Sequence, residues 1–170
     1  MRMSSPWVPI LLAALVLLSD QLSKWVVVST FRLYESLPLI PGFFDLTFVT
    51  NTGAAFGMLA GEQNFWRQIF FVSMTLTALV VLCFAFRQYR HAGKLYVIAI
   101  GLVSGGALGN LVDRLRFGHV IDFLDFYIKS YHWPAFNVAD SAISVGVALF
   151  LLAGYLEHHQ DDHPGQATIN

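Results

Sequence analysis

The sequence predicts an all-α membrane protein with four transmembrane helices and a small β-sheet outside the membrane. Its composition is 56% hydrophobic and only 12% charged, with a mean hydropathy of +0.59. Four runs are long and apolar enough to cross about 30 Å of hydrocarbon at 1.5 Å per residue. They are residues 9–28, 69–86, 95–112 and 138–156. The polar stretches between them are too short to fold separately, so residues 1–170 form one domain.

The overall charge and the cysteine content exclude several classes of protein. A net charge of −1 and a pI near 6.6 indicate no nucleic-acid partner. The single cysteine, Cys83, lies in an apolar run and suits helix packing, because it can form neither an internal disulfide nor a metal cluster. Three histidines in the segment 157–170 belong to a predicted flexible, solvated tail. We therefore expect no metal site.

The first span and the basic loop predict the orientation of the chain. Only Arg2 precedes the first span and no small-x-small cleavage site follows it, which indicates a retained helix rather than a cleaved leader. The loop 87–94 carries three Lys or Arg residues, whereas residues 29–65 contain only Arg32. The positive-inside rule then places both termini and the basic loop in the cytoplasm.

The outer half of the first span contains the polar motif "SDQLSK". Asp20 and Lys24 are four residues apart and share one helical face, so they can pair within the helix. The pair is either a neutralised couple that tolerates burial or an electrostatic brace beneath a polar site. Both interpretations are compatible with the sequence.

The segment between the first two spans has the pattern of a strand and a turn. Prolines and Gly42 break the helix, and two kinds of side chain alternate over residues 43–49, as in a strand with two different faces. The motif "NTGAAF" at 51–56 is either a plain turn or a place where Asn51 and small residues let a substrate approach closely. Residues 69–86 carry no ionisable side chain and are predicted scaffold.

The third span combines small residues with a polar end. Glycines recur every fourth residue at 101, 105 and 109, a pattern that lets a neighbouring helix approach closely. The motif "GNLVDR" at its outer end places Asn110, Asp113 and Arg114 on one side of the helix. Asp113 and Arg114 could neutralise each other as a structural pair, but this would leave Asn110 unexplained.

Two further aspartates lie on either side of one short outer loop. Asp122 stands between aliphatic and aromatic neighbours, whereas Asp125 is expected to be an ordinary exposed acid. Asp140 lies three residues after Asn137, which occupies an N-cap position, so Asp140 could be only a capping-box acid. Because Asp122 and Asp140 bound the same loop, we expect them to converge at one depth.

Two carboxyl groups close together in a partly dry site share one proton. The ionised group can take a proton from water while the protonated group supports a carbonyl under attack. This arrangement, that of an aspartic protease, needs no metal and no cofactor. The helix dipole favours charge on Asp140, and the apolar surroundings of Asp122 favour the proton there.

Two other classes of function are weaker fits. A transporter or proton channel needs a polar path across the membrane, but the inner halves of the predicted spans carry no acid or base. A membrane scaffold that binds partners through its glycine stripe gives Asp122 and Asp140 no reason to share a loop.

The motifs "SDQLSK", "NTGAAF", "GNLVDR", "GHVIDF" and "FNVADS", in this order, resemble the lipoprotein signal peptidase family, signal peptidase II. The resemblance implies an aspartic endopeptidase of the bacterial inner membrane, active at the periplasmic side. Its substrates would be prolipoproteins, cleaved before a diacylglyceryl-modified cysteine. The catalytic residues would be Asp122 and Asp140. The supporting residues would be Asp20, Lys24, Asn51, Asn110, Asp113, Arg114 and Asn137.

The resemblance adds further expectations. An external sheet and a short amphipathic helix would lie within residues 43–66, and residues 56–59 would form a mobile lid. Asp113 would orient Arg114, and Asp20 with Lys24 would brace the floor of the site. The partners would be the prolipoprotein and membrane lipid, the protein would be a monomer, and the cyclic peptide globomycin would block it.

Overall fold

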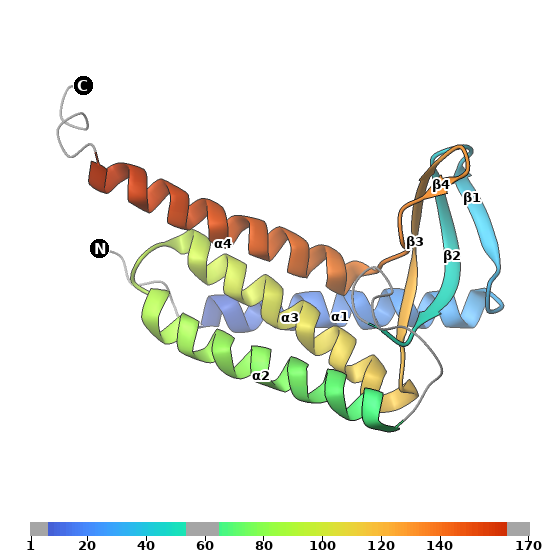
Figure 1. Ribbon diagram of the computed structural model, residues 1–170, viewed down its shortest axis with the longest axis horizontal. Helices are drawn as coiled ribbons and strands as arrows, with labels where there is room; N and C mark the ends of the chain where they lie inside the picture. Colours follow the sequence, from blue (N-terminus) through green and yellow to red (C-terminus); the bar gives the residue numbers. More distant parts are fainter. Residues whose placement is uncertain (1–6, 54–64, 163–170) are drawn as a thin grey trace.

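The computed structural model describes residues 7–53 and 65–162, which contain four long helices and a four-stranded antiparallel sheet (Figure 1). The helices are α1 (Trp7–Thr30), α2 (Phe65–Tyr89), α3 (Lys94–Phe117) and α4 (Val138–Asp162). The strands are β1 (Ser36–Ile40), β2 (Phe44–Asn51), β3 (Val120–Ile128) and β4 (Tyr131–His132). All four helices are long and apolar enough to cross a membrane. The predicted fold class is confirmed.

Each predicted span lies inside a longer helix, because a helix continues beyond the hydrocarbon into the interface. The predicted flexible tail, 157–170, was placed too early: α4 continues to Asp162, and residues 163–170 lie outside the described ranges. The expected amphipathic helix and the lid at 56–59 fall largely in residues 54–64, which are also outside them.

Helix α3 is the centre of the bundle and packs against α1, α2 and α4 (Figure 1). A methyl group added at Gly105 would lie 2.7 Å from the carbonyl oxygen of Ala13 on α1. The same group at Gly106 would collide with the carbonyl oxygen of Ala139 on α4. The predicted packing role of the glycine stripe is therefore confirmed, and Gly106 extends it to a second neighbour.

The sheet has the order β1-β2-β3-β4 and lies at the end of the bundle where α1 and α3 end and α4 begins (Figure 1). The strand predicted at 43–49 corresponds to β2 (Phe44–Asn51). Its alternation is interrupted, because the register with β3 shifts between Leu46 and Val49. Strand β3 begins just after Gly118, whose left-handed φ of 74° ends α3 and redirects the chain into the sheet.

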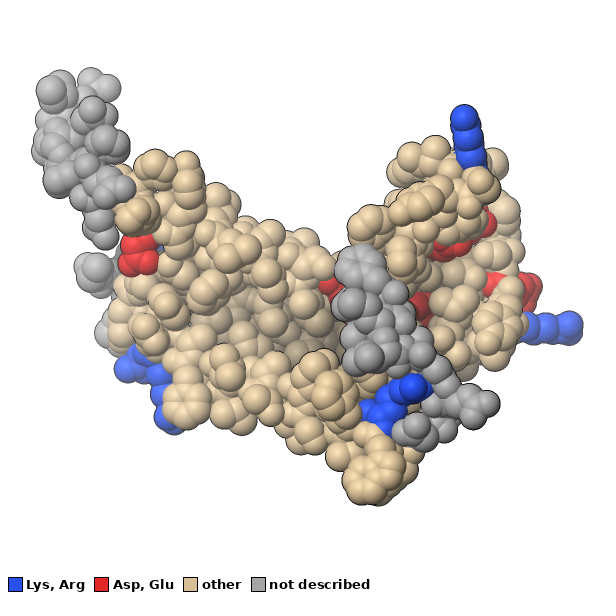
Figure 2. Space-filling model, viewed as in Figure 1, with Lys and Arg blue, Asp and Glu red and all other residues tan. Residues whose placement is uncertain are grey.

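The opposite end of the bundle holds the start of α1, the end of α4 and the connection between α2 and α3 (Figure 1). The basic loop 87–94 therefore lies far from the sheet. On the face shown in Figure 2, a band without Lys, Arg, Asp or Glu separates charged groups at the two ends, and the surface is hollowed between the helices and the sheet. The charged groups are arranged as in a protein whose middle part is surrounded by lipid.

Candidate active site

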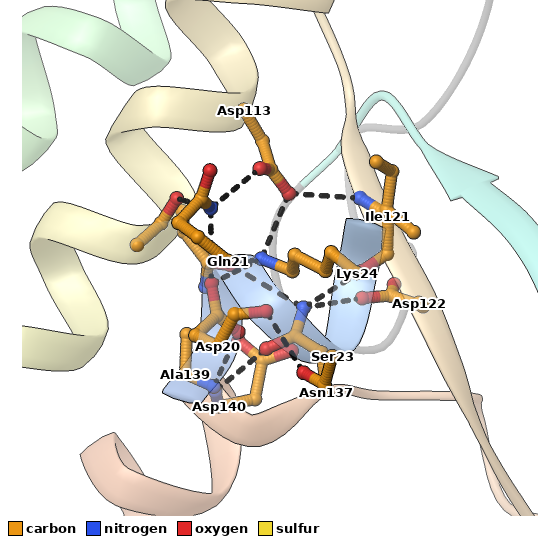
Figure 3. Close-up of polar contacts among 12 residues, drawn as sticks. Asp20, Gln21, Ser23, Lys24, Asp113, Ile121, Asp122, Asn137, Ala139 and Asp140 are labelled. Atoms are coloured by element: carbon orange, nitrogen blue, oxygen red, sulfur yellow. Dashed lines mark hydrogen bonds and ion pairs between the residues drawn. The ribbon is translucent and has the colours of Figure 1, made fainter. Parts of the chain in front are cut away.

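The end of the bundle next to the sheet contains an unusual number of buried polar side chains. They are Asp20, Lys24, Thr47, Asn110, Asp113, Asp122 and Asn137. They come from α1, α3, two strands and the start of α4, and those drawn in Figure 3 point toward one another. Buried polar groups require partners, so their contacts define the site.

The ammonium group of Lys24 lies between two carboxylates (Figure 3). Its Nζ is 2.8 Å from Asp20 Oδ2 and 2.7 Å from Asp113 Oδ2, and the three side chains are at most 2% exposed. The pairing predicted for Asp20 and Lys24 is confirmed.

The direct contacts of Asp113 and Arg114 are to other partners than each other: the carboxylate of Asp113 contacts Lys24 on α1, and the guanidinium of Arg114 contacts Gly53. The charge of Asp113 still acts on Arg114, so its orienting role stays a prediction. Consecutive residues on a helix point about 100° apart, so neighbours in sequence serve different partners.

Gln21 is a member of this cluster that the motif analysis missed. Its Nε2 donates to Asp113 Oδ1 at 2.9 Å and to Asp20 Oδ2 at 3.2 Å. The same nitrogen lies 3.2 Å from the carbonyl oxygen of Gly109, where the absence of a side chain leaves room. A polar side chain next to Asp20 within an apolar span was the available signal.

The two acids beside Lys24 also connect the helices to the other elements of the site. Asp20 Oδ1 accepts the backbone N–H of Ala139 at 2.9 Å, in the first turn of α4. Asp113 Oδ2 accepts the backbone N–H of Ile121 at 3.1 Å, in β3. The positive end of the α4 dipole favours a carboxylate at this position. The cluster thus ties α1 to the two elements that carry Asp122 and Asp140.

Asn137 is the N-cap of α4, as predicted. Its Oδ1 accepts the backbone N–H of Asp140 at 2.9 Å. The Asp140 carboxylate is not explained by capping, because its Oδ1 accepts the Nδ2 of Asn110 at 2.7 Å. This aspartate therefore faces α3 across the site.

A path of side-chain amides connects the two predicted catalytic acids. Asn110 donates to Asp140, and Asn137 Nδ2 donates to Asp122 Oδ1 at 2.7 Å. Between the two amides, Asn137 Nδ2 lies 3.3 Å from Asn110 Oδ1. Asp122 and Asp140 are far apart in sequence and come from different elements, yet they meet at one end of one hydrogen-bonded cluster.

The surroundings of Asp122 favour its protonated form. Burial, and secondarily the negative charge of Asp140, raise the pKa of Asp122 to about 7. Hydrogen bonds from Asn51 and Asn137 and the charge of Lys24 oppose this rise only in part. Asp122 can thus hold a proton near neutral pH, as expected from its apolar neighbours.

Arg114 and Asn51 lie at the edge of the site where β2 ends. The Nη2 of Arg114 donates to the carbonyl oxygen of Gly53 at 3.1 Å, and its guanidinium carbon lies 5.2 Å from the ring centroid of Phe71. Asn51 Oδ1 accepts the backbone N–H of Gly53 at 2.9 Å. Asn51 thus forms the predicted turn and also bonds to Asp122, while the close approach of a substrate at this turn stays a prediction.

Asp125 lies outside this cluster, and its predicted exposure is wrong. Its side chain is only 15% exposed, and one carboxylate oxygen lies 2.9 Å from Nδ1 of His132. Pairing between β3 and β4 explains the burial, because it sets Tyr127 beside His132. Within residues 7–53 and 65–162, no group of three Asp, Glu, His or Cys side chains could hold a metal ion.

Comparisons with known proteins agree on one family. The family model described as signal peptidase (SPase) II matches residues 12–156. A lipoprotein signal peptidase of Syntrophus aciditrophicus is 53% identical over 149 residues, 88% of this chain and 92% of that protein. Its counterpart in Syntrophotalea carbinolica is 51% identical, over 90% of this chain and 94% of that protein.

Solved structures agree with the sequence relatives. A bacterial membrane enzyme solved by the in meso method at 2.3 Å resolution superimposes with a TM-score of 0.84 at 31% identity, over 99% of this chain and 98% of that one. A second, solved at 1.9 Å, gives a TM-score of 0.78 at 35% identity, over 89% and 95% of the two chains. The similarity therefore covers both the helices and the sheet.

Proposed function

The chain belongs to the signal peptidase II family, and from this premise we propose that it is an aspartic endopeptidase that removes signal peptides from prolipoproteins. The curated relatives carry the name lipoprotein signal peptidase. The catalytic groups we assign are the carboxyls of Asp122 and Asp140, with water as the nucleophile.

One observation carries the assignment: the two carboxyls, from β3 and α4, are joined through the side-chain amides of Asn137 and Asn110. Each acid accepts an amide N–H, so each is held in a fixed orientation. A structural ion pair would bring a carboxylate to a cation, as Asp20 and Asp113 are brought to Lys24. The carboxyl groups of Asp122 and Asp140 instead lie within each other's electric field, which favours a single proton shared between them.

The proposed reaction begins with Asp140 ionised and Asp122 protonated. Asp140 takes a proton from water, whose oxygen forms a bond to the scissile carbonyl carbon, and Asp122 gives its proton to the carbonyl oxygen. The tetrahedral intermediate then returns that proton to Asp122 and re-forms the carbonyl. The carbon–nitrogen bond breaks as the leaving nitrogen takes the proton from Asp140.

The location of the site suits a substrate held in the membrane. A signal peptide is itself a membrane helix, and a diacylglyceryl-cysteine keeps its chains in lipid, so the scissile bond would reach the end of the bundle by lateral diffusion. We propose that this end faces the periplasm of the bacterial inner membrane. The basic loop 87–94 and both chain termini would then be cytoplasmic, in accord with the positive-inside rule.

The remaining assignments follow from position. Arg114 and Asn51 lie beside the backbone of Gly53, where they can reach the carbonyl groups of an extended substrate. Asn110 and Asn137 orient the acids, while Asp20, Lys24 and Asp113 hold α1, α3, β3 and α4 in register. We propose that a monomer suffices, with the lipidated prolipoprotein and membrane lipid as partners and no cofactor.

The test replaces each acid by its isosteric amide. Asp122→Asn and Asp140→Asn should fold and insert but lower prolipoprotein cleavage by at least about 10³-fold, because each loses a proton-transfer group. The matched control is Asp125→Asn, three residues along the same strand, which should keep normal turnover. Cleavage is followed with a diacylglyceryl-modified prolipoprotein in detergent or vesicles. Normal processing by either the Asp122→Asn or the Asp140→Asn variant, once shown to be folded, would overturn the proposal.

A further inference from the structure

We propose that Lys24 is a positioning residue that decides which acid is the general base, because it orients Asn110 to stabilise ionised Asp140. The inference rests on the proposed function and deepens it. Lys24 contacts Asn110, which in turn donates to Asp140, so the ammonium acts on this acid through an intervening amide as well as through its charge.

The three hydrogens of the Lys24 ammonium are fully used. Two go to Asp20 and Asp113, at 2.8 and 2.7 Å, and the third goes to Asn110 Oδ1 at 3.1 Å. The Lys24 side chain is only 2% exposed, so bulk water does not compete for these contacts. The position of the ammonium is therefore set by three acceptors in three directions.

The ammonium in turn fixes the orientation of the Asn110 amide. A Lys ammonium has donors only, so the oxygen of the amide must face it. The NH₂ group of Asn110 is thereby turned to Asp140, 2.7 Å away. The cation polarises the amide, which strengthens its N–H donation to a charged acceptor more than to a neutral one. The arrangement favours a carboxylate at Asp140 over a carboxylic acid.

Within the described part of the chain, no cation contacts the second amide of the pair, that of Asn137. Asn137 Oδ1 accepts the backbone N–H of Asp140, and Asn137 Nδ2 donates to Asp122. Asp122 accepts hydrogen bonds from Asn51 and from Asn137, which is less polarised than Asn110, in a site whose burial favours the protonated form of Asp122. The two acids are chemically identical, and the difference between their amide partners makes the pair asymmetric.

Other charges near Asp140 do not produce the same asymmetry. Among residues 7–53 and 65–162, the charged or titratable groups that face this end of α4 are Asp20 and Lys24 from α1, Asp113 and Arg114 from α3, and Asp122 from β3. The charge of Lys24 acts through space on both Asp122 and Asp140, so this charge by itself does not distinguish the two acids. The directed hydrogen bond through Asn110 acts on Asp140 specifically and adds to the effect of the α4 dipole on this acid.

The first test removes the cation at constant net charge. The double variant Lys24→Gln/Asp113→Asn loses one positive and one negative group, so the net charge of the cluster is unchanged. The bonds of Asp20 to Gln21 and to Ala139 involve neither substituted residue and are retained. We expect the acid limb of the kcat/KM profile to move up by about one pH unit, so that kcat at pH values well below this limb falls about tenfold while KM is nearly unchanged. The alkaline limb should stay within about 0.3 pH unit. An unmoved acid limb would overturn the inference.

If the double variant fails to fold, a second, matched pair of variants tests whether each amide acts on one acid alone. Asn110→Asp replaces the donor to Asp140 by an acceptor, and Asn137→Asp does the same for Asp122. Asn110→Asp should move mainly the acid limb, and Asn137→Asp mainly the alkaline limb. Equal movement of both limbs in both variants would refute a directed role of Lys24. Asp140→Asn is measured in parallel, because its activity tests the proposed function alone.

Discussion

The two ends of the same bundle are built from different chemistry. Next to the sheet, Lys24, two aspartates and Asn110 are buried, and the amide of half-buried Gln21 bonds to the aspartates. At the opposite end, aromatic rings fill the space between helices. Buried charges are tolerated only when every one is paired, so the first end depends on the position of each atom, whereas the second depends mainly on shape.

The aromatic end joins α2, α3 and α4. Tyr89 stacks on Tyr96 with ring centroids 4.7 Å apart, and Phe150 contacts both rings edge-on at 5.3 and 5.0 Å. The hydroxyl of Tyr96 donates to Glu157 Oε2 at 2.7 Å. Ring packing of this kind adds about 0.5–1.5 kcal/mol per pair beyond the buried area. It holds the helices without constraining any group at the other end.

The largest effect on stability is expected from Lys24→Met. The substitution leaves the carboxylates of Asp20 and Asp113 buried without their cation, which costs about 3–5 kcal/mol when one partner of a buried pair is removed. Thermal unfolding in detergent measures the loss. The same substitution at exposed Lys94, at the aromatic end, is the matched control and should change stability by less than about 0.5 kcal/mol. Equal losses at both positions would contradict the difference between the two ends.

The second prediction concerns pH, which should affect the charged end alone. Because the pKa of Asp122 is raised to about 7 by burial and by Asp140, the folded protein keeps a proton that the unfolded chain releases near pH 4. The contribution of this proton to the free energy of unfolding is fully present below about pH 4 and is lost as the pH rises through 7. Activity should fall about tenfold per pH unit above 7, since Asp122, the general acid that we propose, loses its proton.

This pH dependence is measured as kcat/KM between pH 5 and 9, together with the unfolding temperature at each pH. Enzyme that stays fully active at pH 9 would show that Asp122 is not the protonated partner. A variant at the aromatic end serves as the control, because no change there should move the alkaline limb.

The smallest effect is expected from Tyr96→Phe. The variant keeps the ring packing and loses the hydrogen bond to Glu157, which should lower the free energy of unfolding by about 1 kcal/mol. Prolipoprotein cleavage and its pH profile should match the unsubstituted protein. A change in kcat would reveal coupling between the two ends that their separate packing does not predict.

The sequence predicted more of the helices than of the sheet. Apolar runs of membrane length are a local signal, so all four spans were found, although α4 is longer than expected. Strand β3 was not predicted, because Asp122 and Asp125 interrupt its apolar pattern and its pairing with β2 is long-range. The same limitation explains Asp125, whose partner His132 comes from a hairpin that no local pattern indicates.

For the site, spacing identified the residues but not all of their partners. The helical spacing of four correctly paired Asp20 with Lys24, and the N-cap pattern correctly placed Asn137. The ion pair of Asp113 with Lys24, and the three acceptors around Gln21, join α1 to α3 and became visible only when the helices were packed.

The sequence by itself determined the features that are set within one helix. These are the length of each span, the face on which each polar group lies, and the chemical identity of the acids. Tertiary structure decided which groups touch. The glycines of α3 allow α1 and α4 to approach closely, and only then can the ammonium of Lys24 meet Asn110. The physical reason is that a hydrogen bond acts over about 3 Å, whereas a sequence pattern specifies direction and not distance between elements.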